Sequence, residues 1–127
     1  MWSHGNFYWN ELNTRDAEAA KKFYGSTLGW LFEPMPMPSG TTYWVAKLAD
    51  TPVAGIFPMN GPDFEGVPEA WFPYISVDDV DKRTKKLIAA GGKIIRGPYD
   101  VPNVGRLVIL ADNAGVRLGF MTPTGED

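Results

Sequence analysis

The chain carries one local pattern twice: an apolar stretch, an Asp, a helical stretch and, thirteen residues after the Asp, a Gly. Asp16 precedes Gly29 in this way, and Asp79 precedes Gly92. An Asp just ahead of a helix can accept the unpaired amide protons of the first turn, and a Gly just past it can adopt the left-handed closing conformation. The two copies therefore predict two helices, each entered from a strand and ended by a glycine.

The segments that follow the two predicted helices repeat as well. A shift of 62 residues places Asp50 on Asp112 and Ile56 on Leu118, while the helix copies are offset by 63 residues. Two nearly equal shifts indicate a duplicated βαβββ unit, and one such unit is too small to bury its sheet and helix alone. We therefore predict an α+β fold in which two tandem βαβββ units form a curved sheet cup with one helix per unit on the outside.

The chain length of 127 residues suits one domain and leaves little room for two. Within the predicted domain 1–127, the first unit spans about 6–59 and the second about 71–121. The segment 60–70 is rich in turn-forming residues and is predicted to link them.

Two details of the predicted elements concern packing and loops. Phe23 and Tyr24 fall at helical spacing in the first helix and are predicted core anchors. Three prolines in seven residues predict a loop over 34–40, because proline breaks a helix and a central strand. The segment GPYDVPNVG predicts a second loop over 97–105.

Composition excludes several kinds of partner. The net charge is −3, and the basic cluster Lys82, Arg83, Lys85 and Lys86 lies in a predicted helix beside Asp78, Asp79 and Asp81, as is typical of a solvated helix face. No nucleic-acid partner is expected. No apolar run approaches the roughly 20 residues of a membrane span, and no basic-then-apolar leader is visible, so we expect no membrane partner and a cytoplasmic location. The absence of cysteine excludes thiol chemistry.

The order of short motifs resembles that of a known superfamily. These motifs are FYG and LGW near the end of the first helix, VDDVD and AAGGK around the second, GR, and a D-x-x-G turn before the last strand. Together they are similar to the vicinal oxygen chelate superfamily, which includes glyoxalase, bleomycin-resistance proteins, extradiol dioxygenases and methylmalonyl-CoA epimerase. The resemblance runs from about Asn6 to Met121. It implies the fold but not the reaction, because this superfamily hosts unrelated chemistries on one scaffold.

The resemblance also implies four metal-ligand positions, and in this chain none of them holds a ligand. The positions of the two metal histidines correspond to Trp9 and Phe72, that of the last-strand Glu to Gly119, and its counterpart in the first unit to Phe57. An oxygen-and-imidazole site cannot be built from aromatic rings and a glycine. We therefore expect no metal and no other cofactor; His4, as the single histidine, cannot supply a two-histidine site.

Strand alternation predicts which side chains line the cup, since residues two apart share a face. The predicted ligand-binding residues are Trp9, Glu11, Asn13, Phe57, Phe72, Tyr74 and Arg117. Aromatic walls with a few polar groups are typical of a small-molecule pocket. The leading prediction is therefore a glyoxalase/bleomycin-resistance-like protein that binds a small aromatic or amphipathic ligand in a metal-free cup.

Glu11 is the predicted catalytic residue of an alternative function. A carboxylate beside Trp9 would be partly desolvated and so a better base, which would make the protein a lyase or isomerase of the glyoxalase type. Such an enzyme could also use a metal at a displaced site. Against this, Glu11 could pair with Arg117 or Arg106, or reach solvent at a subunit edge. Arg117 could instead clamp a carboxylate or phosphate of a ligand.

A third interpretation is a homodimeric interaction module. Aromatic residues make up 13% of the chain, more than a small core needs. Trp2, Trp30 and Trp71 are the candidate interface residues.

Overall fold

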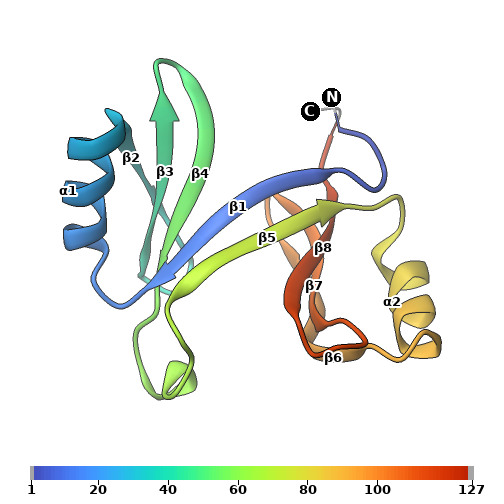
Figure 1. The fold of residues 1–127 in the computed structure, drawn as a ribbon. Coiled ribbons are helices and arrows are strands. Elements are labelled where there is room, and N and C mark those ends of the chain that lie inside the picture. Colours follow the sequence, from blue (N-terminus) through green and yellow to red (C-terminus); the bar gives the residue numbers. More distant parts are fainter. Residues whose placement is uncertain (1, 126–127) are drawn as a thin grey trace. The chain divides into compact units, whose positions relative to one another are not determined.

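The computed structural model describes residues 2–125 (Figure 1). Over this range the first repeat contains β1 (Phe7–Thr14), α1 (Ala17–Leu28), β2 (Leu31–Pro36), β3 (Thr42–Leu48) and β4 (Thr51–Pro58), followed by a short 3-10 helix, η1 (Pro62–Phe64). The second repeat contains β5 (Ala70–Ser76), α2 (Val80–Ala89), β6 (Lys93–Val101), β7 (Gly105–Ala111) and β8 (Arg117–Pro123). The predicted α+β fold with two βαβββ units is confirmed. None of the helices in residues 2–125 has the length and apolar character needed to cross a membrane.

The described residues form two bodies, one of residues Trp9–Trp71 and one of residues 2–8 with 72–125. The strand order in the first body is β2-β3-β4-β1, and in the second it is β5-β8-β7-β6. In each body the first strand of the repeat runs parallel to the last strand, while the other pairs are antiparallel. This shared topology confirms the duplication. The cup, which would need both bodies, stays a prediction, as do the domain and linker boundaries.

The strand register corrects one part of the repeat alignment. Glu11 pairs with Gly55 in the first body, and Tyr74 pairs with Gly119 in the second. Gly55 therefore corresponds to Gly119, two residues further on than the turn-based shift of 62 predicts. The connection between β7 and β8 is longer than that between β3 and β4. The turn residues Asp50 and Asp112 therefore do not occupy equivalent positions relative to the strands that follow them. Because the difference is even, the predicted faces are unaffected. The prediction of Phe57 as the first-unit counterpart of Gly119 is wrong, however, because the register assigns that place to Gly55.

Both predicted N-caps are present. The Asp16 carboxylate accepts a hydrogen bond from the Ala19 amide at 3.0 Å, and the Asp79 carboxylate accepts one from the Lys82 amide at 3.1 Å. Gly29 closes α1 with a positive φ of 77°. Each acceptor satisfies one amide that a helix start otherwise leaves unpaired.

The end of α2 differs from the prediction by one residue. The left-handed residue is Gly91, with φ of 95°, and not Gly92. Position 92 favours glycine for a steric reason, because a Cβ there would lie 2.9 Å from the Ala111 carbonyl oxygen. The Gly92 amide donates to the Leu87 carbonyl at 2.8 Å, which ties the exit of the helix to its last turn.

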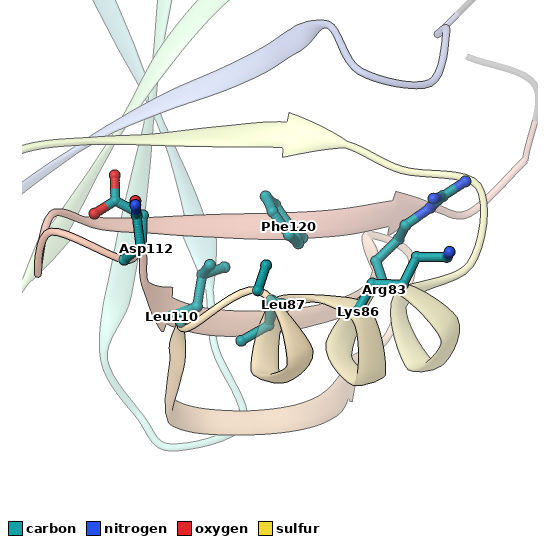
Figure 2. A pocket seen from close by; sticks show the side chains of 9 residues that line it. Arg83, Lys86, Leu87, Leu110, Asp112 and Phe120 are labelled. Atoms are coloured by element: carbon teal, nitrogen blue, oxygen red, sulfur yellow. The ribbon is translucent and has the colours of Figure 1, made fainter.

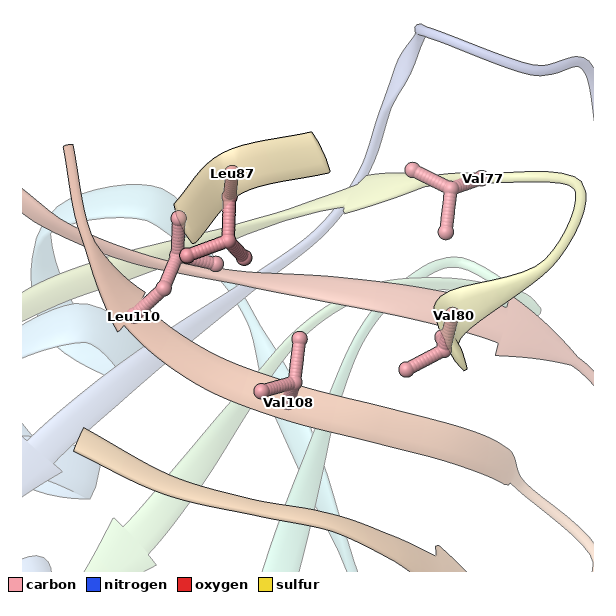
Figure 3. Close-up of a cluster of buried hydrophobic side chains, with 5 residues drawn as sticks. All are labelled: Val77, Val80, Leu87, Val108 and Leu110. Atoms are coloured by element: carbon pink, nitrogen blue, oxygen red, sulfur yellow. The ribbon is translucent and has the colours of Figure 1, made fainter. Parts of the chain in front are cut away.

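The core of the second body lies between α2 and the sheet. Its buried residues are Val77, Val80, Leu87, Val108 and Leu110 (Figure 3). Helix α2 lies against β6, β7 and β8 (Figure 1) and buries three side chains, those of Val80, Thr84 and Leu87. These positions recur at helical spacing, so a single stripe of α2 faces the core.

Helix α1 contradicts the predicted packing, because none of its side chains is buried. Phe23 is 59% exposed, so its prediction as a core anchor is wrong, and Tyr24 is only half-buried. Part of the contact between α1 and the sheet is instead a cation–π pair: the Lys21 ammonium lies 3.2 Å from the centre of the Trp44 ring. A lysine on α1 therefore makes the contact with Trp44.

Both predicted loops contain strand. β2 runs through Pro34 to Pro36, and β6 continues through Gly97 and Pro98 to Val101. Each is an edge strand, pairing with one neighbour only, and an edge tolerates residues that cannot donate to a second partner. Register shifts in β6 accommodate the Gly-Pro step.

Replacing the cap residues tests the duplicated helix starts. Asp16→Ala and Asp79→Ala should each lower the free energy of unfolding by about 1 kcal/mol, because one first-turn amide loses its acceptor. The matched variants Asp16→Asn and Asp79→Asn keep an acceptor and should remain near the parent value in urea unfolding. Equal stability of the Ala and Asn variants would contradict the capping role.

Candidate functional site

One face of the sheet in the first body gathers the predicted residues of that body. We call it the Trp9 face, and it consists of Trp9, Glu11, Asn13, Tyr43, Gly55 and Phe57. Glu11 pairs with Gly55 and Asn13 with Phe57 across the β1–β4 ladder, so these side-chain positions share a face. Helix α1 covers the opposite face, where Lys21 meets Trp44.

A hydrogen-bonded group of three side chains occupies this face. The Trp9 indole N–H donates to the Tyr43 hydroxyl oxygen at 2.8 Å. The Tyr43 hydroxyl is in turn hydrogen bonded to the Glu11 carboxylate. Burial, and then the nearby Glu11 charge, raise the pKa of Tyr43 above its usual range, and the opposing effect of the Trp9 N–H is smaller. Tyr43 therefore keeps its proton at neutral pH, and the O–H is a donor for Glu11.

Tyr43 is a residue that sequence reasoning missed. It lies on β3, and the sequence does not reveal how β3 is registered against β4. Val45 pairs with Gly55, and Tyr43 is two residues away on the same face. A Cβ added at Gly55 would overlap the Tyr43 hydroxyl. The missing side chain at Gly55 is therefore what allows the phenol to reach Trp9 and Glu11.

Asn13 provides an unpaired acceptor beside this group. Its side-chain oxygen is buried, and no described residue donates a hydrogen bond to it. On the same face, the ring of its neighbour Phe57 packs against Phe64 with centroids 5.5 Å apart. A buried acceptor without a donor costs free energy, so a ligand N–H or O–H that donates to the Asn13 oxygen would bind favourably.

The three predicted residues of the second body are arranged differently. Phe72 and Tyr74 meet edge to face with ring centroids 5.3 Å apart. Arg117 is exposed, and its side chain makes no hydrogen bond or ion pair with residues 2–125. Arg106, an alternative partner predicted for Glu11, forms ion pairs with Asp81 and Asp100 of its own body.

The positions that correspond to metal ligands do not fit a divalent cation. The single heteroatom of the Trp9 side chain is an N–H donor already bonded to Tyr43. A Cβ at Gly119 would overlap the Tyr74 ring, so a longer side chain there needs that ring to move. Over the described part of the chain, no three His, Cys, Asp or Glu side chains lie together as a candidate metal site.

His4 has a structural role. Its Nδ1 accepts a hydrogen bond from the Asp78 amide at 3.0 Å and lies 3.4 Å from the Asp78 carboxylate. This contact holds the N-terminal segment beside the start of α2. It ties the histidine to the second body rather than to the Trp9 face.

A separate aromatic group lies on the surface of the first body. Tyr24 stacks on Trp30 at 5.5 Å and meets Trp71 edge to face at 5.6 Å, and the Trp71 N–H donates to the Tyr24 hydroxyl at 3.2 Å. Phe23 joins it through Tyr24 at 4.9 Å. Two of the three predicted interface tryptophans thus lie together. Trp2 belongs to the other body, where its N–H donates to the Gly125 carbonyl; the homodimer stays a prediction.

Adding a methyl group at Gly55 or Gly119 tests the space that these glycines leave. Gly55→Ala and Gly119→Ala should each lower the free energy of unfolding by about 1–3 kcal/mol, because the added Cβ overlaps a tyrosine. Gly25→Ala is the control: its Cβ would meet ordinary contacts of 3.5 Å, and alanine favours the helix. Urea unfolding at neutral pH measures all three. A Gly55→Ala variant as stable as the parent would show that Tyr43 does not need the gap.

Comparisons with known proteins agree with this fold. The family model of the glyoxalase/bleomycin resistance protein/dioxygenase superfamily matches residues 7–120. Among solved structures, a hypothetical protein from Bacillus halodurans C-125 superposes with a TM-score of 0.73 at 13% identity, covering 98% of this chain and 99% of that chain. Methylmalonyl-CoA epimerase from Mycobacterium tuberculosis superposes with a TM-score of 0.67 at 12% identity, covering 98% and 94%. At such identities the likeness concerns the fold alone.

Two relatives are closer in sequence. A protein described as a putative glyoxylase, CFP32 of Mycobacterium tuberculosis, is 38% identical over 120 residues, which are 94% of this chain and 46% of that protein. The anthracycline biosynthesis protein DnrV of Streptomyces peucetius is 34% identical over 119 residues, covering 84% of this chain and 43% of that protein. The chain thus spans less than half the length of these relatives. From the family match, the chain belongs to the glyoxalase/bleomycin resistance protein/dioxygenase superfamily.

Proposed function

We propose that this chain binds a small aromatic or amphipathic molecule on the Trp9 face. The observation that carries the proposal is the hydrogen-bonded group of Trp9, Tyr43 and Glu11 on the face that α1 leaves uncovered. Rings supply contact area, and a few fixed polar groups supply orientation, which is how small-molecule sites are built.

Each side chain of the Trp9 face has a distinct part in this proposal. Trp9 and Phe57 offer ring surface for a planar or apolar ligand body. Tyr43, which keeps its proton, donates to Glu11 and so stabilises the ionised carboxylate. Glu11 is then an anchor for an N–H, an O–H or a cation of the ligand. The unpaired Asn13 oxygen is a second acceptor nearby.

Phe72, Tyr74 and Arg117 are further proposed ligand-binding residues. The paired rings of Phe72 and Tyr74 resemble the aromatic part of the Trp9 face. The guanidinium of Arg117, uncommitted among the described residues, could bind a carboxylate or phosphate.

The names of relatives favour a polycyclic or carbonyl-bearing ligand. DnrV is named for anthracycline biosynthesis, and anthracyclines are fused-ring aromatic compounds. Other proteins of this fold are methylmalonyl-CoA epimerases, so the fold is known to accommodate CoA esters. For this chain, an anthracycline is therefore a reasonable first probe.

Ligand binding predicts a specific loss of affinity. Trp9→Phe should weaken binding of an anthracycline about three- to tenfold, because the larger ring and its N–H are lost. Trp71→Phe removes the same atoms from the surface aromatic group and should leave the affinity unchanged. Titration followed by anthracycline fluorescence measures both. No saturable binding by a panel of planar aromatic compounds, or equal loss in the two variants, would contradict the proposal.

A glyoxalase-type lyase or isomerase is the second candidate. It is favoured by the fixed position of Glu11, whose carboxylate is held by Tyr43 within an aromatic surface. We rank it second because an O–H donated to a carboxylate stabilises the ionised form and so weakens it as a base.

Elemental analysis and a conservative variant separate the two candidates. Protein purified without chelators should contain no stoichiometric zinc, nickel, manganese or iron, since Trp9, Phe57, Phe72 and Gly119 offer no ligand. Glu11→Gln, which keeps the side-chain shape, should alter ligand affinity rather than abolish a reaction. A turnover that Glu11→Gln abolishes would establish the enzyme instead, and stoichiometric metal would contradict the metal-free site.

A further inference from the structure

A groove lies beside α2 in the second body, and none of its lining residues belongs to the Trp9 face. We call it the α2 groove, and its labelled lining residues are Arg83, Lys86, Leu87, Leu110, Asp112 and Phe120 (Figure 2). Its volume is about 480 Å³, and the groove is largely open to solvent. The groove is therefore large enough for a ligand and lies wholly within one body.

The groove exists because α2 covers only part of the sheet. The helix buries a single stripe of residues, and its C-cap is Ala90, followed by the left-handed Gly91. Ala90 and Gly92, which also line the groove, have too little side chain to fill the space. Phe120 therefore remains only partly buried, although it packs against the core cluster.

The floor and the rim of the groove differ in chemistry. Leu87, Leu110 and Phe120 form an apolar floor continuous with the core. Arg83 and Lys86 stand three residues apart on α2, so their side chains share one face of the helix (Figure 2). A ligand in this groove would contact apolar side chains on the floor and positively charged side chains on α2.

The two cations are not equivalent. The Arg83 guanidinium makes two hydrogen bonds to the Asp78 carboxylate, at 2.8 and 3.0 Å. The hydrogen bonds from Arg83, and to a smaller degree the nearby positive charge, lower the pKa of Asp78 to about 2. The Arg83–Asp78 pair therefore persists at neutral pH. Lys86 has no such acid: no ion pair joins it to another described residue. The available positive charge of the groove is therefore that of Lys86.

The far end of the groove is polar but already engaged. The Asp112 carboxylate accepts hydrogen bonds from the amides of Ala114 at 2.8 Å and Val116 at 3.0 Å, which shape the turn before β8. Asp112 is thus a turn-forming residue, and it makes this end unfavourable for an anion. An anionic group would be directed to the Lys86 end.

We propose that the α2 groove binds a small amphipathic monoanion, a carboxylate with an aliphatic body. The aliphatic part would lie mainly against Phe120, the partly exposed residue of the floor, and the carboxylate would pair with Lys86. A polyanion such as nucleic acid does not fit, because the groove offers one unpaired cation and the chain carries a net charge of −3. This site is separate from the Trp9 face, so its failure would leave the proposed function untouched.

Octanoate is the probe that tests this site, with acetate as the head group alone. Titration of isotope-labelled protein should give saturable amide shifts for octanoate at Gly92, Asn113 and Phe120, and none for acetate at the same concentration. Lys86→Gln should weaken octanoate binding about threefold, the size expected of one exposed ion pair. Lys85→Gln, an equal change of charge on an exposed neighbour outside the groove lining, should have no effect.

A second variant tests the cavity without changing charge. Ala90→Phe adds a ring at the exposed end of α2, where it should fill the groove and abolish the octanoate shifts. A dissociation constant of roughly 1 mM is expected, so the shifts should saturate by roughly 10 mM octanoate. Absence of saturation at that concentration would overturn the proposal. Equal effects of Lys85→Gln and Lys86→Gln, or shifts confined to residues 9–71, would overturn it as well. Retained binding in a folded Ala90→Phe variant would also overturn it.

Discussion

Parallel pairing between the first and last strand of each repeat determines which side chains of those two strands lie opposite one another. In the first body this pairing sets Glu11 opposite Gly55, and in the second it sets Tyr74 opposite Gly119. Both glycines leave space for a tyrosine, from β3 in one case and from β5 in the other. A displacement by one residue would exchange the two faces and bring the helix-facing side chains into the site.

The Trp9 face shows how a scaffold can change its chemistry while keeping its fold. The positions that the family resemblance assigns to metal ligands hold rings or glycines, since the strand register makes Gly55 the counterpart of Gly119. The Trp9 ring forms a contact of its own with Tyr43, and on the same face Phe57 packs against Phe64. Polar groups are retained at Glu11 and Asn13. The face is therefore adapted to hold a molecule by contact area and hydrogen bonds rather than by coordination.

Local signals in the sequence predicted local structure well, whereas packing depended on contacts that sequence does not show. The caps at Asp16 and Asp79 and the duplicated unit could be read from spacing, because a cap involves residues three apart. Tyr43 could not be assigned to the site, because its position depends on register between strands. Phe23 was misplaced: its side chain is largely exposed, and the α1 side chain that lies over Trp44 is that of Lys21. The proline-containing strand β2 was missed because its edge position cannot be recognised from composition.

The overlap between Tyr74 and any side chain at position 119 makes these two positions interdependent. Introducing a carboxylate by Gly119→Glu would bring its Cβ into the Tyr74 ring, and replacing Tyr74 with a smaller residue would leave a gap beside the glycine. Each single change is therefore expected to be unfavourable, and the cost of both together is expected to be smaller than the sum of the two. A carboxylate built into this strand would therefore need a smaller residue at position 74 at the same time.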